Sequence, residues 1–137
     1  MNIKVLRFNS ELNNPNFISE YQVNKSNLLQ ALIEIKTIND NSLTFRCGCK
    51  SGVCGSCAVR VNGIEKLACK TIINENDLIE PIKNSPIIKD LVVDVSHETF
   101  LIGKMGLSID DDNAVNKVTQ EDIKKIDLQS NCILCNS

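Results

Sequence analysis

The sequence predicts an α+β fold, with a β-grasp domain over residues 1–89 and a partly helical connector over residues 90–137. Three observations predict this fold. Two strand-like stretches open the chain, one amphipathic helical stretch follows them, and further strand-like stretches come after a loop rich in glycine and cysteine. A strand pair, a crossing helix and then more strands is the order expected of a β-grasp sheet.

The first two strands are expected at residues 3–8, "IKVLRF", and at residues 17–23, "FISEYQV". In the second stretch the odd-numbered residues from Phe17 to Val23 share one face, because side chains alternate along a strand. The intervening "NNP" at residues 13–15 has the residues that favour turns. These features predict an N-terminal hairpin.

A helix is expected next, with Ser26 as a candidate N-cap and "NDN" at residues 39–41 as its end. Its apolar residues recur at helical spacing, which predicts one face packed across the hairpin. That predicted face consists of Leu28, Ala31, Leu32, Ile35 and Ile38.

A second hairpin is expected within "CAVRVNGIEKLAC" at residues 57–69, because Asn62-Gly63 is a strong signal for a two-residue turn. A last short strand is expected at residues 78–82, "LIEPI", where Pro81 stops it.

The register of this second hairpin bears on two cysteines. With a strict two-residue turn, Cys57 would lie opposite Ala68, and Cys69 would face the other side of the sheet. An extra residue at the turn would bring the two sulfurs to one face. We therefore predict a bulged turn with Gly63 in the left-handed conformation, provided that strand pairing persists as far back as Cys57.

Beyond Pro86 the sequence changes character. The stretch from residue 87 to 105 looks helical in part, the acidic run at residues 110–112 resembles a linker, and "TQEDIKKIDLQ" at residues 119–129 predicts a short capped helix. His97, the single histidine, is expected to be a surface or helix residue without a ligand role.

Composition and charge exclude several classes of function. The net charge is −2, with 15 basic and 17 acidic side chains, and only four Phe and one Tyr are present, so no nucleic-acid surface is expected. Lys4 and Arg7 interrupt the first apolar stretch, which argues against a secretory signal, and no apolar run is long enough to span a bilayer. We expect no direct membrane insertion. Seven cysteines, an odd number, indicate metal or redox chemistry in a reducing compartment.

Four cysteines follow the pattern C-x4-C-x2-C-x11-C. A two-iron cluster needs four thiolates, and a tight loop that supplies three of them, with a fourth from a nearby strand, is a known way to hold one. Gly52 and Gly55 lie between the ligands, where a loop that points N–H groups at sulfur needs positive φ. The cationic residues nearby could offset the negative charge of the cluster. The candidate ligands are Cys49, Cys54, Cys57 and Cys69, and the cationic flanks are Arg46, Lys50 and Arg60.

Two other sites remain as alternatives. A zinc site usually shows two pairs of closely spaced ligands, and the C-x4-C spacing is loose for that. Disulfides between cysteines so close in sequence would close strained small rings. A cluster is favoured over both.

The stretch "SLTFRCGCKSGVCGSCAVRVNGIEKLACK" resembles the N-terminal ferredoxin-like domain of the iron-sulfur subunit of succinate dehydrogenases and fumarate reductases. The loop "CKSGVCGSC", the eleven-residue interval to Cys69 and the later "IEPIKNSPIIKDLVVDVS" carry the resemblance, which extends over nearly the whole chain. It implies a 2Fe-2S ferredoxin-like domain with Cys49, Cys54, Cys57 and Cys69 as the ligands of the cluster. Cys47 departs from the family pattern and stays open as an alternative to Cys49.

The resemblance also implies a second domain that opens with C-I-x-C-x-x-C and holds a 4Fe-4S and a 3Fe-4S cluster. Here "CILCNS" supplies Cys132 and Cys135, and the chain stops one residue short of the third cysteine. We expect a fragment in which these two cysteines lack their partners; pairing with each other or adventitious metal binding is the alternative.

The function implied by the resemblance is a one-electron relay within an oxidoreductase. Its partners would be an FAD-containing flavoprotein subunit, which acts on succinate or fumarate, and a membrane anchor or quinone-reactive subunit. The chain would be peripheral on the inner (plasma) membrane, at its cytoplasmic face, and would carry no substrate site of its own. The alternatives are a free-standing ferredoxin-like carrier and a zinc-stabilised interaction module.

Overall fold

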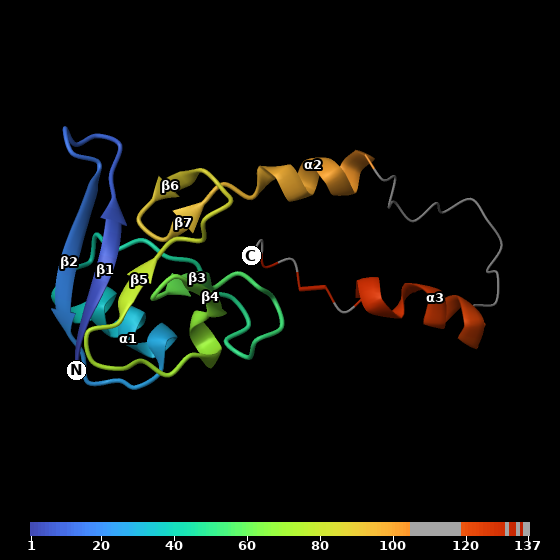
Figure 1. Cartoon of the computed structure of the whole chain (residues 1–137), viewed down its shortest axis with the longest axis horizontal. Helices are drawn as coiled ribbons and strands as arrows, with labels where there is room; N and C mark the ends of the chain where they lie inside the picture. The colour runs from blue at the N-terminus through green and yellow to red at the C-terminus, as the bar shows by residue number, and fades with distance from the viewer. Residues whose placement is uncertain (105–118, 131, 134, 136–137) are drawn as a thin grey trace. The chain divides into compact units, whose positions relative to one another are not determined.

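The computed structural model describes residues 1–104, 119–130, 132–133 and 135. The chain forms two compact units, one built on Met1–Val95 and the other on Ser96–Ile133. The domain boundary that the sequence predicts after residue 89 stays a prediction. The first unit contains a five-stranded mixed sheet with α1 packed on one face, so the α+β fold expected from the sequence is confirmed (Figure 1).

The strands of the main sheet are ordered β2-β1-β5-β3-β4. The central strand β5 pairs in parallel with β1 and antiparallel with β3, while the two hairpins lie on either side of it. Both predicted hairpins and the predicted last strand are present. The bounds are β1 Asn2–Phe8, β2 Asn16–Gln22, β3 Ala58–Val61, β4 Ile64–Leu67 and β5 Leu78–Glu80.

Helix α1, Leu28–Glu34, covers the core face of the sheet. Its N-cap is Asn27 and not Ser26: the Asn27 side-chain oxygen accepts a hydrogen bond from the Gln30 N–H at 3.3 Å. The Ser26 carbonyl instead accepts from the Ile73 N–H at 2.9 Å, because this segment pairs with the chain after the second hairpin. The helix and the sheet enclose a core whose fully buried members include Ile3, Val5, Val23, Leu28, Ala31, Ile35, Leu43 and Ile79.

The predicted apolar face of the helix was wrong at its last position. A π-helical turn, η1, spans Ile35–Asn39 directly after α1. Ile35 is fully buried, but Ile38 is 77% exposed. A π-turn bonds each N–H one residue further back than an α-turn does, so the side chains after it leave the phase that the 3.6-residue period predicts.

Because the π-turn buries Ile35 and exposes Ile38, we expect substitutions at these two positions to change the free energy of unfolding by different amounts. Ile35→Ala should lower the free energy of unfolding by about 2–5 kcal/mol, because it leaves a cavity in the core. Ile38→Ala is the matched control and should change it by less than about 0.5 kcal/mol. Urea unfolding of the two variants measures both values, and equal losses would place Ile38 in the core and contradict the π-turn.

The β3–β4 hairpin has a strict two-residue turn. Val61 pairs with Ile64 and Ala58 pairs with Leu67, and Asn62 and Gly63 have φ values of 51° and 81°. The expected left-handed Gly63 is confirmed, but the expected bulge is wrong. Positive φ at both central residues defines the turn that best matches the twist of a hairpin, and no extra residue is needed there.

A 3-10 turn replaces the bulge that the sequence predicted. Strand β4 ends at Leu67, and η2, Ala68–Lys70, begins at the next residue. The Ala68 N–H still donates to the Cys57 carbonyl at 2.9 Å, so Cys57 does lie opposite Ala68. Because Cys69 belongs to η2 and not to the strand, the two-residue alternation no longer decides its direction.

A small second hairpin follows the main sheet, with β6 at Ile87–Lys89 and β7 at Val92–Val93. The sequence had suggested partial helix for residues 87–105, which α2, at Ser96–Lys104, confirms; the two short strands before it were not expected. His97 lies exposed in α2, as expected. The predicted short helix is α3, Gln120–Ser130, where Thr119 Oγ1 accepts from the Asp122 N–H at 3.3 Å. The acidic run at 110–112 lies outside the described residues.

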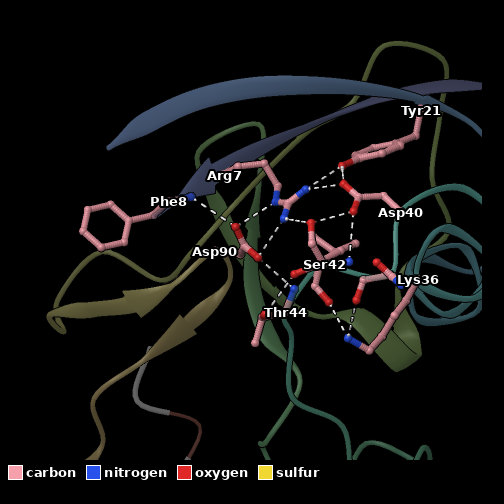
Figure 2. Close-up of polar contacts among 10 residues, drawn as sticks. Arg7, Phe8, Tyr21, Lys36, Asp40, Ser42, Thr44 and Asp90 are labelled. Carbon is pink, nitrogen blue, oxygen red and sulfur yellow. Dashed lines mark hydrogen bonds and ion pairs between the residues drawn. The ribbon is translucent and has the colours of Figure 1, made fainter. Parts of the chain in front are cut away.

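Within the first unit, a buried arginine connects β1 to the end of η1 and to the turn between β6 and β7. Arg7 occupies a core-facing position of β1 and is 4% exposed (Figure 2). Its guanidinium donates to both carboxylate oxygens of Asp90, at 2.7 and 3.1 Å, and to Asp40 at 2.6 Å. Tyr21 and Ser42 accept its remaining hydrogen bonds at 2.8 and 3.0 Å. A charge buried this deeply needs such partners, because its desolvation is costly.

The same network shifts two pKa values. Hydrogen bonds from Ser42, and further ones from Tyr21 and Arg7, hold the pKa of Asp40 well below its usual value. Burial, and then the hydrogen bond to Asp40, raises the pKa of Tyr21. Both directions favour a charged carboxylate and a protonated phenol, which is the combination that the hydrogen-bond geometry requires.

Asp90 also fixes the chain that leads into the cysteine loop. Its carboxylate accepts hydrogen bonds from the Thr44 N–H at 2.8 Å and the Phe8 N–H at 3.3 Å. Next to it, the Leu91 N–H donates to the Thr44 carbonyl at 3.2 Å. The turn between β6 and β7 therefore holds β1 and residue 44 together, directly before the loop begins (Figure 2).

Candidate metal centre

The cysteine loop leaves the core at Leu43, which is fully buried, and returns to it at Cys57, which is 5% exposed. Between them Gly52 and Gly55 have φ values of 84° and 68°, as their positions in the sequence predicted. Lys50 also has a positive φ, 59°, which is uncommon for a residue with a Cβ. The tight turns of this loop bring backbone N–H groups close to its sulfurs.

Two of the predicted ligands meet within the loop. The Cys49 sulfur accepts hydrogen bonds from the Ser51 and Val53 N–H groups, each at 3.3 Å, and the Cys54 sulfur accepts from the Cys49 N–H at 3.4 Å. Hydrogen bonds from the Ser51 side chain and from these two N–H groups lower the pKa of Cys49 to about 5. The hydroxyl of Ser56, and then the Cys49 N–H, lower the pKa of Cys54. The loop therefore favours thiolates, the form that binds metal.

The other two ligands meet where η2 approaches the end of the loop. Burial raises the pKa of the Cys57 thiol, and the adjacent thiols of Cys69 and Cys54 raise it further, because a second negative charge there is unfavourable. Asn27, the N-cap of α1, donates from its side-chain nitrogen to the Cys69 carbonyl at 3.0 Å. The helix cap thus also holds η2 in place.

Two glycines allow the loop to pack this closely. A Cβ at Gly48 would lie 3.0 Å from the Cys54 sulfur, and a Cβ at Gly52 would lie 2.7 Å from the Lys70 side chain. The contact at Gly48 is with a predicted ligand, so a larger residue there would displace a sulfur of the site.

The four thiols form two neighbouring pairs. Cys49 lies beside Cys54, Cys57 lies beside Cys69, and Cys54 and Cys57 are close enough for their charges to interact. Within the part of the chain that the structure describes, no three His, Cys, Asp or Glu side chains gather closely enough to hold a single metal ion. Four thiols in two pairs match the donor set of a two-iron cluster, in which each iron takes two thiolates.

The chain has three further cysteines. Cys47 is exposed, as is Cys49 two residues later. Cys132 is exposed and Cys135 is half-buried. No helix among the described residues is both long and apolar enough to cross a membrane.

Several contributors to the site were not expected from the sequence. Asn27 had been passed over for Ser26 as the cap, and neither Ser51 nor Val53 had been singled out as a donor to Cys49. The pairing of Arg7 with Asp90 could not be read from local sequence, because these residues are 83 positions apart. A charged residue on the core-facing side of an otherwise apolar strand was the one available hint.

A ferredoxin-like sheet with a glycine-rich loop of paired thiols defines an iron-sulfur protein. Known proteins support this class: the sequence profile of the family described as "2Fe-2S iron-sulfur cluster binding domain" matches residues 2–99. The chain belongs to this family, and a 2Fe-2S cluster is therefore its cofactor, as expected from the sequence.

Relatives are iron-sulfur subunits of larger enzymes. The chain is 46% identical over 103 residues to the fumarate reductase iron-sulfur subunit of Haemophilus influenzae, covering 71% of this chain and 40% of that protein. It is 33% identical over 149 residues to the fumarate reductase iron-sulfur subunit of Shigella flexneri, covering 98% of this chain and 60% of that protein.

A solved structure also matches. A chain of the Mycobacterium smegmatis Sdh1 complex in the apo form matches with a TM-score of 0.75 and 25% identity, over 98% of this chain and 59% of that chain. The chain thus spans less than two thirds of the length of each of these three relatives.

Proposed function

We propose that this chain relays single electrons through a 2Fe-2S cluster held by Cys49, Cys54, Cys57 and Cys69. The observation that carries the proposal is that these thiols lie in two neighbouring pairs, Cys49 beside Cys54 and Cys57 beside Cys69. A single tetrahedral ion such as zinc needs all four ligands around one point, and paired thiols suit two irons better.

The residues of the chain supply three functions at this site. The low pKa of Cys49 supplies a thiolate without a strong base. The N–H groups of Ser51 and Val53 stay directed at its sulfur, where hydrogen bonds stabilise negative charge and raise the reduction potential. Burial of Cys57 limits solvent access on the core side. When bound, the cluster supplies one-electron redox chemistry, which this chain's own side chains lack.

We propose the following partners and location. The relatives are subunits of oxidoreductases, which supports an FAD-containing flavoprotein subunit as electron donor or acceptor, and a membrane anchor or quinone-reactive subunit on the other side. The chain would lie peripherally on the inner (plasma) membrane, at its cytoplasmic face. Residues 1–89 would be the cluster domain, and Cys132 and Cys135 would begin the motif of a 4Fe-4S and 3Fe-4S domain.

Metal and sulfide analysis tests the cluster. After anaerobic reconstitution we expect about two irons and two acid-labile sulfides per chain, a brown-red colour that bleaches on reduction, and a rhombic low-temperature EPR signal from the reduced protein. The same reconstitution with zinc in place of iron is the control for adventitious binding by thiols. A colourless chain that retains zinc in preference to iron would support the zinc-stabilised module instead.

A further inference from the structure

Basic residues concentrate around the cysteine loop. The chain as a whole has a net charge of −2, yet residues 41–73 contain five basic side chains and one acidic one, Glu65. Two of these six charges are engaged elsewhere: Arg60 pairs with Glu80 at 3.8 Å, and Glu65 accepts a hydrogen bond from the Lys83 N–H at 3.2 Å. The other four are Arg46, Lys50, Lys66 and Lys70, which we call the basic collar.

The basic collar has no compensating charge. None of its four members forms a salt bridge with any residue of the described part of the chain. Three of them are exposed and Arg46 is half-buried. Clusters of unpaired like charges raise the local potential, which attracts a partner of the opposite sign.

The basic collar flanks the thiols on two sides. The stem of Lys70 lies against Gly52 of the loop. Lys50 and Cys69 line one hollow of about 230 Å3, together with Leu29 and Ile33 of α1. Lys66 and Lys70 line another of about 430 Å3, together with Leu67 and Ile72.

Two exposed apolar side chains lie near members of the basic collar: Val53 follows Lys50 in the loop, and Ile72 lines the hollow of Lys66 and Lys70. Val53, in the loop, is 66% exposed, and Ile72, at the edge of the larger hollow, is 63% exposed. An apolar centre within a charged rim is the usual anatomy of a protein interface. Single exposed apolar residues are ordinary, but here both lie within a few residues of a predicted ligand, at 54 and 69.

The cluster alone does not account for the basic collar. Two ferric ions, two sulfides and four thiolates sum to a formal charge of about −2. The four unpaired cations exceed that charge, so a net positive surface remains when the cluster is bound.

We propose that the basic collar is a docking surface for a protein partner whose contact face is rich in carboxylates around an apolar centre. The acidic chemistry follows from the charges of this chain, whereas the role of that partner in electron transfer rests on the proposed function. Nucleic acid fits the surface poorly, because the one aromatic residue in the loop, Phe45, packs against the core. An anionic membrane fits poorly too, since Val53 and Ile72 lack the length of the residues that anchor proteins in lipid.

Fluorescence anisotropy with synthetic peptides tests the surface in the full chain. One labelled peptide has a Leu-Leu centre flanked by glutamates, a second has Ser-Ser at the centre, and a third has lysines in place of the glutamates. We expect the first to bind most tightly, the second more weakly and the third not at all. Raising the ionic strength should weaken the first, because exposed charges are screened.

Charge-reversal variants localise the binding. Lys66→Glu/Lys70→Glu should weaken binding of the first peptide by about tenfold or more. Lys50→Glu/Lys66→Glu leaves the contact of Lys70 with Gly52 intact and should weaken binding similarly, so loss of that contact cannot explain both results. The matched control Lys89→Glu/Lys124→Glu makes the same change in net charge on exposed residues of β6 and α3, outside residues 41–73, and should leave binding unchanged.

Several outcomes would overturn the proposal. Equal losses in the control variant would assign binding to net charge, and tighter binding to phosphatidylglycerol vesicles or duplex DNA than to the first peptide would assign the surface to a different partner. The measurements are made on both iron-loaded and iron-free chain. Iron binding without peptide binding rejects the docking surface alone, whereas peptide binding by a chain that takes up no iron supports the surface and rejects the proposed relay.

Discussion

Cys69→Ser is expected to abolish the visible absorption of the reconstituted protein and to reduce its bound iron to near zero. Cys69 is the only predicted ligand outside the loop, and it is positioned by η2 and by the Asn27 side chain. A serine oxygen is a harder and less acidic donor than a thiolate, so it holds iron-sulfur clusters poorly. Iron and acid-labile sulfide per chain, with EPR after reduction, measure the effect.

Cys47→Ser is the matched control, because Cys47 is an exposed thiol in the same loop. It should leave iron content and the EPR signal unchanged. Cys49→Ser should behave like Cys69→Ser, since Cys49 receives the N–H groups of Ser51 and Val53. If instead Cys47→Ser loses the cluster and Cys49→Ser keeps it, the ligand set begins at Cys47 and our assignment is wrong.

Asp90→Ala is expected to lower the free energy of unfolding by about 3–5 kcal/mol. The substitution removes two hydrogen bonds from the Arg7 guanidinium, which stays buried with Asp40 as its one remaining carboxylate partner. It also leaves the Thr44 N–H without its acceptor. Urea unfolding monitored by circular dichroism measures the change.

Glu20→Gln provides the control for this effect. The Lys4–Glu20 ion pair has an N–O distance of 3.3 Å, but its side chains are 41% and 68% exposed. Surface pairs of this kind contribute little, so the expected change is below about 0.5 kcal/mol. If Asp90→Ala and Glu20→Gln lowered the free energy of unfolding by similar amounts, the buried Arg7 network would stabilise the fold no more than a surface ion pair does.

Local sequence patterns predicted several elements correctly. Strands β1 and β2 lie where alternation predicts them, at residues 3–8 and 17–23. The β3–β4 hairpin turns at Asn62-Gly63, and β5 ends just before Pro81, as predicted. The spacing of the cysteines also predicts which four act together, and that assignment stays a prediction. In each case the signal lies within a few residues, where backbone preference and side-chain period act directly.

The errors share a different origin. Ile38 was expected to be buried, but the helix changes to a π-turn after Glu34; a bulge was expected at Gly63, but η2 after Leu67 redirects Cys69 instead. Both depend on how the end of an element packs against segments distant in sequence. Ser26 was a reasonable cap, but its backbone pairs with residue 73.

The order of the strands and helix and the hairpin turns could therefore be predicted from the sequence, because they depend on local preference and spacing, and the same spacing proposes the group of four thiols. The packing of distant segments instead decides that Asp90 and Asp40 neutralise Arg7, that η2 rather than a bulge directs Cys69, and that the basic collar has no salt-bridge partner among the described residues. Those features depend on which distant segments meet in the folded chain, and burial and charge pairing, not local period, select that arrangement.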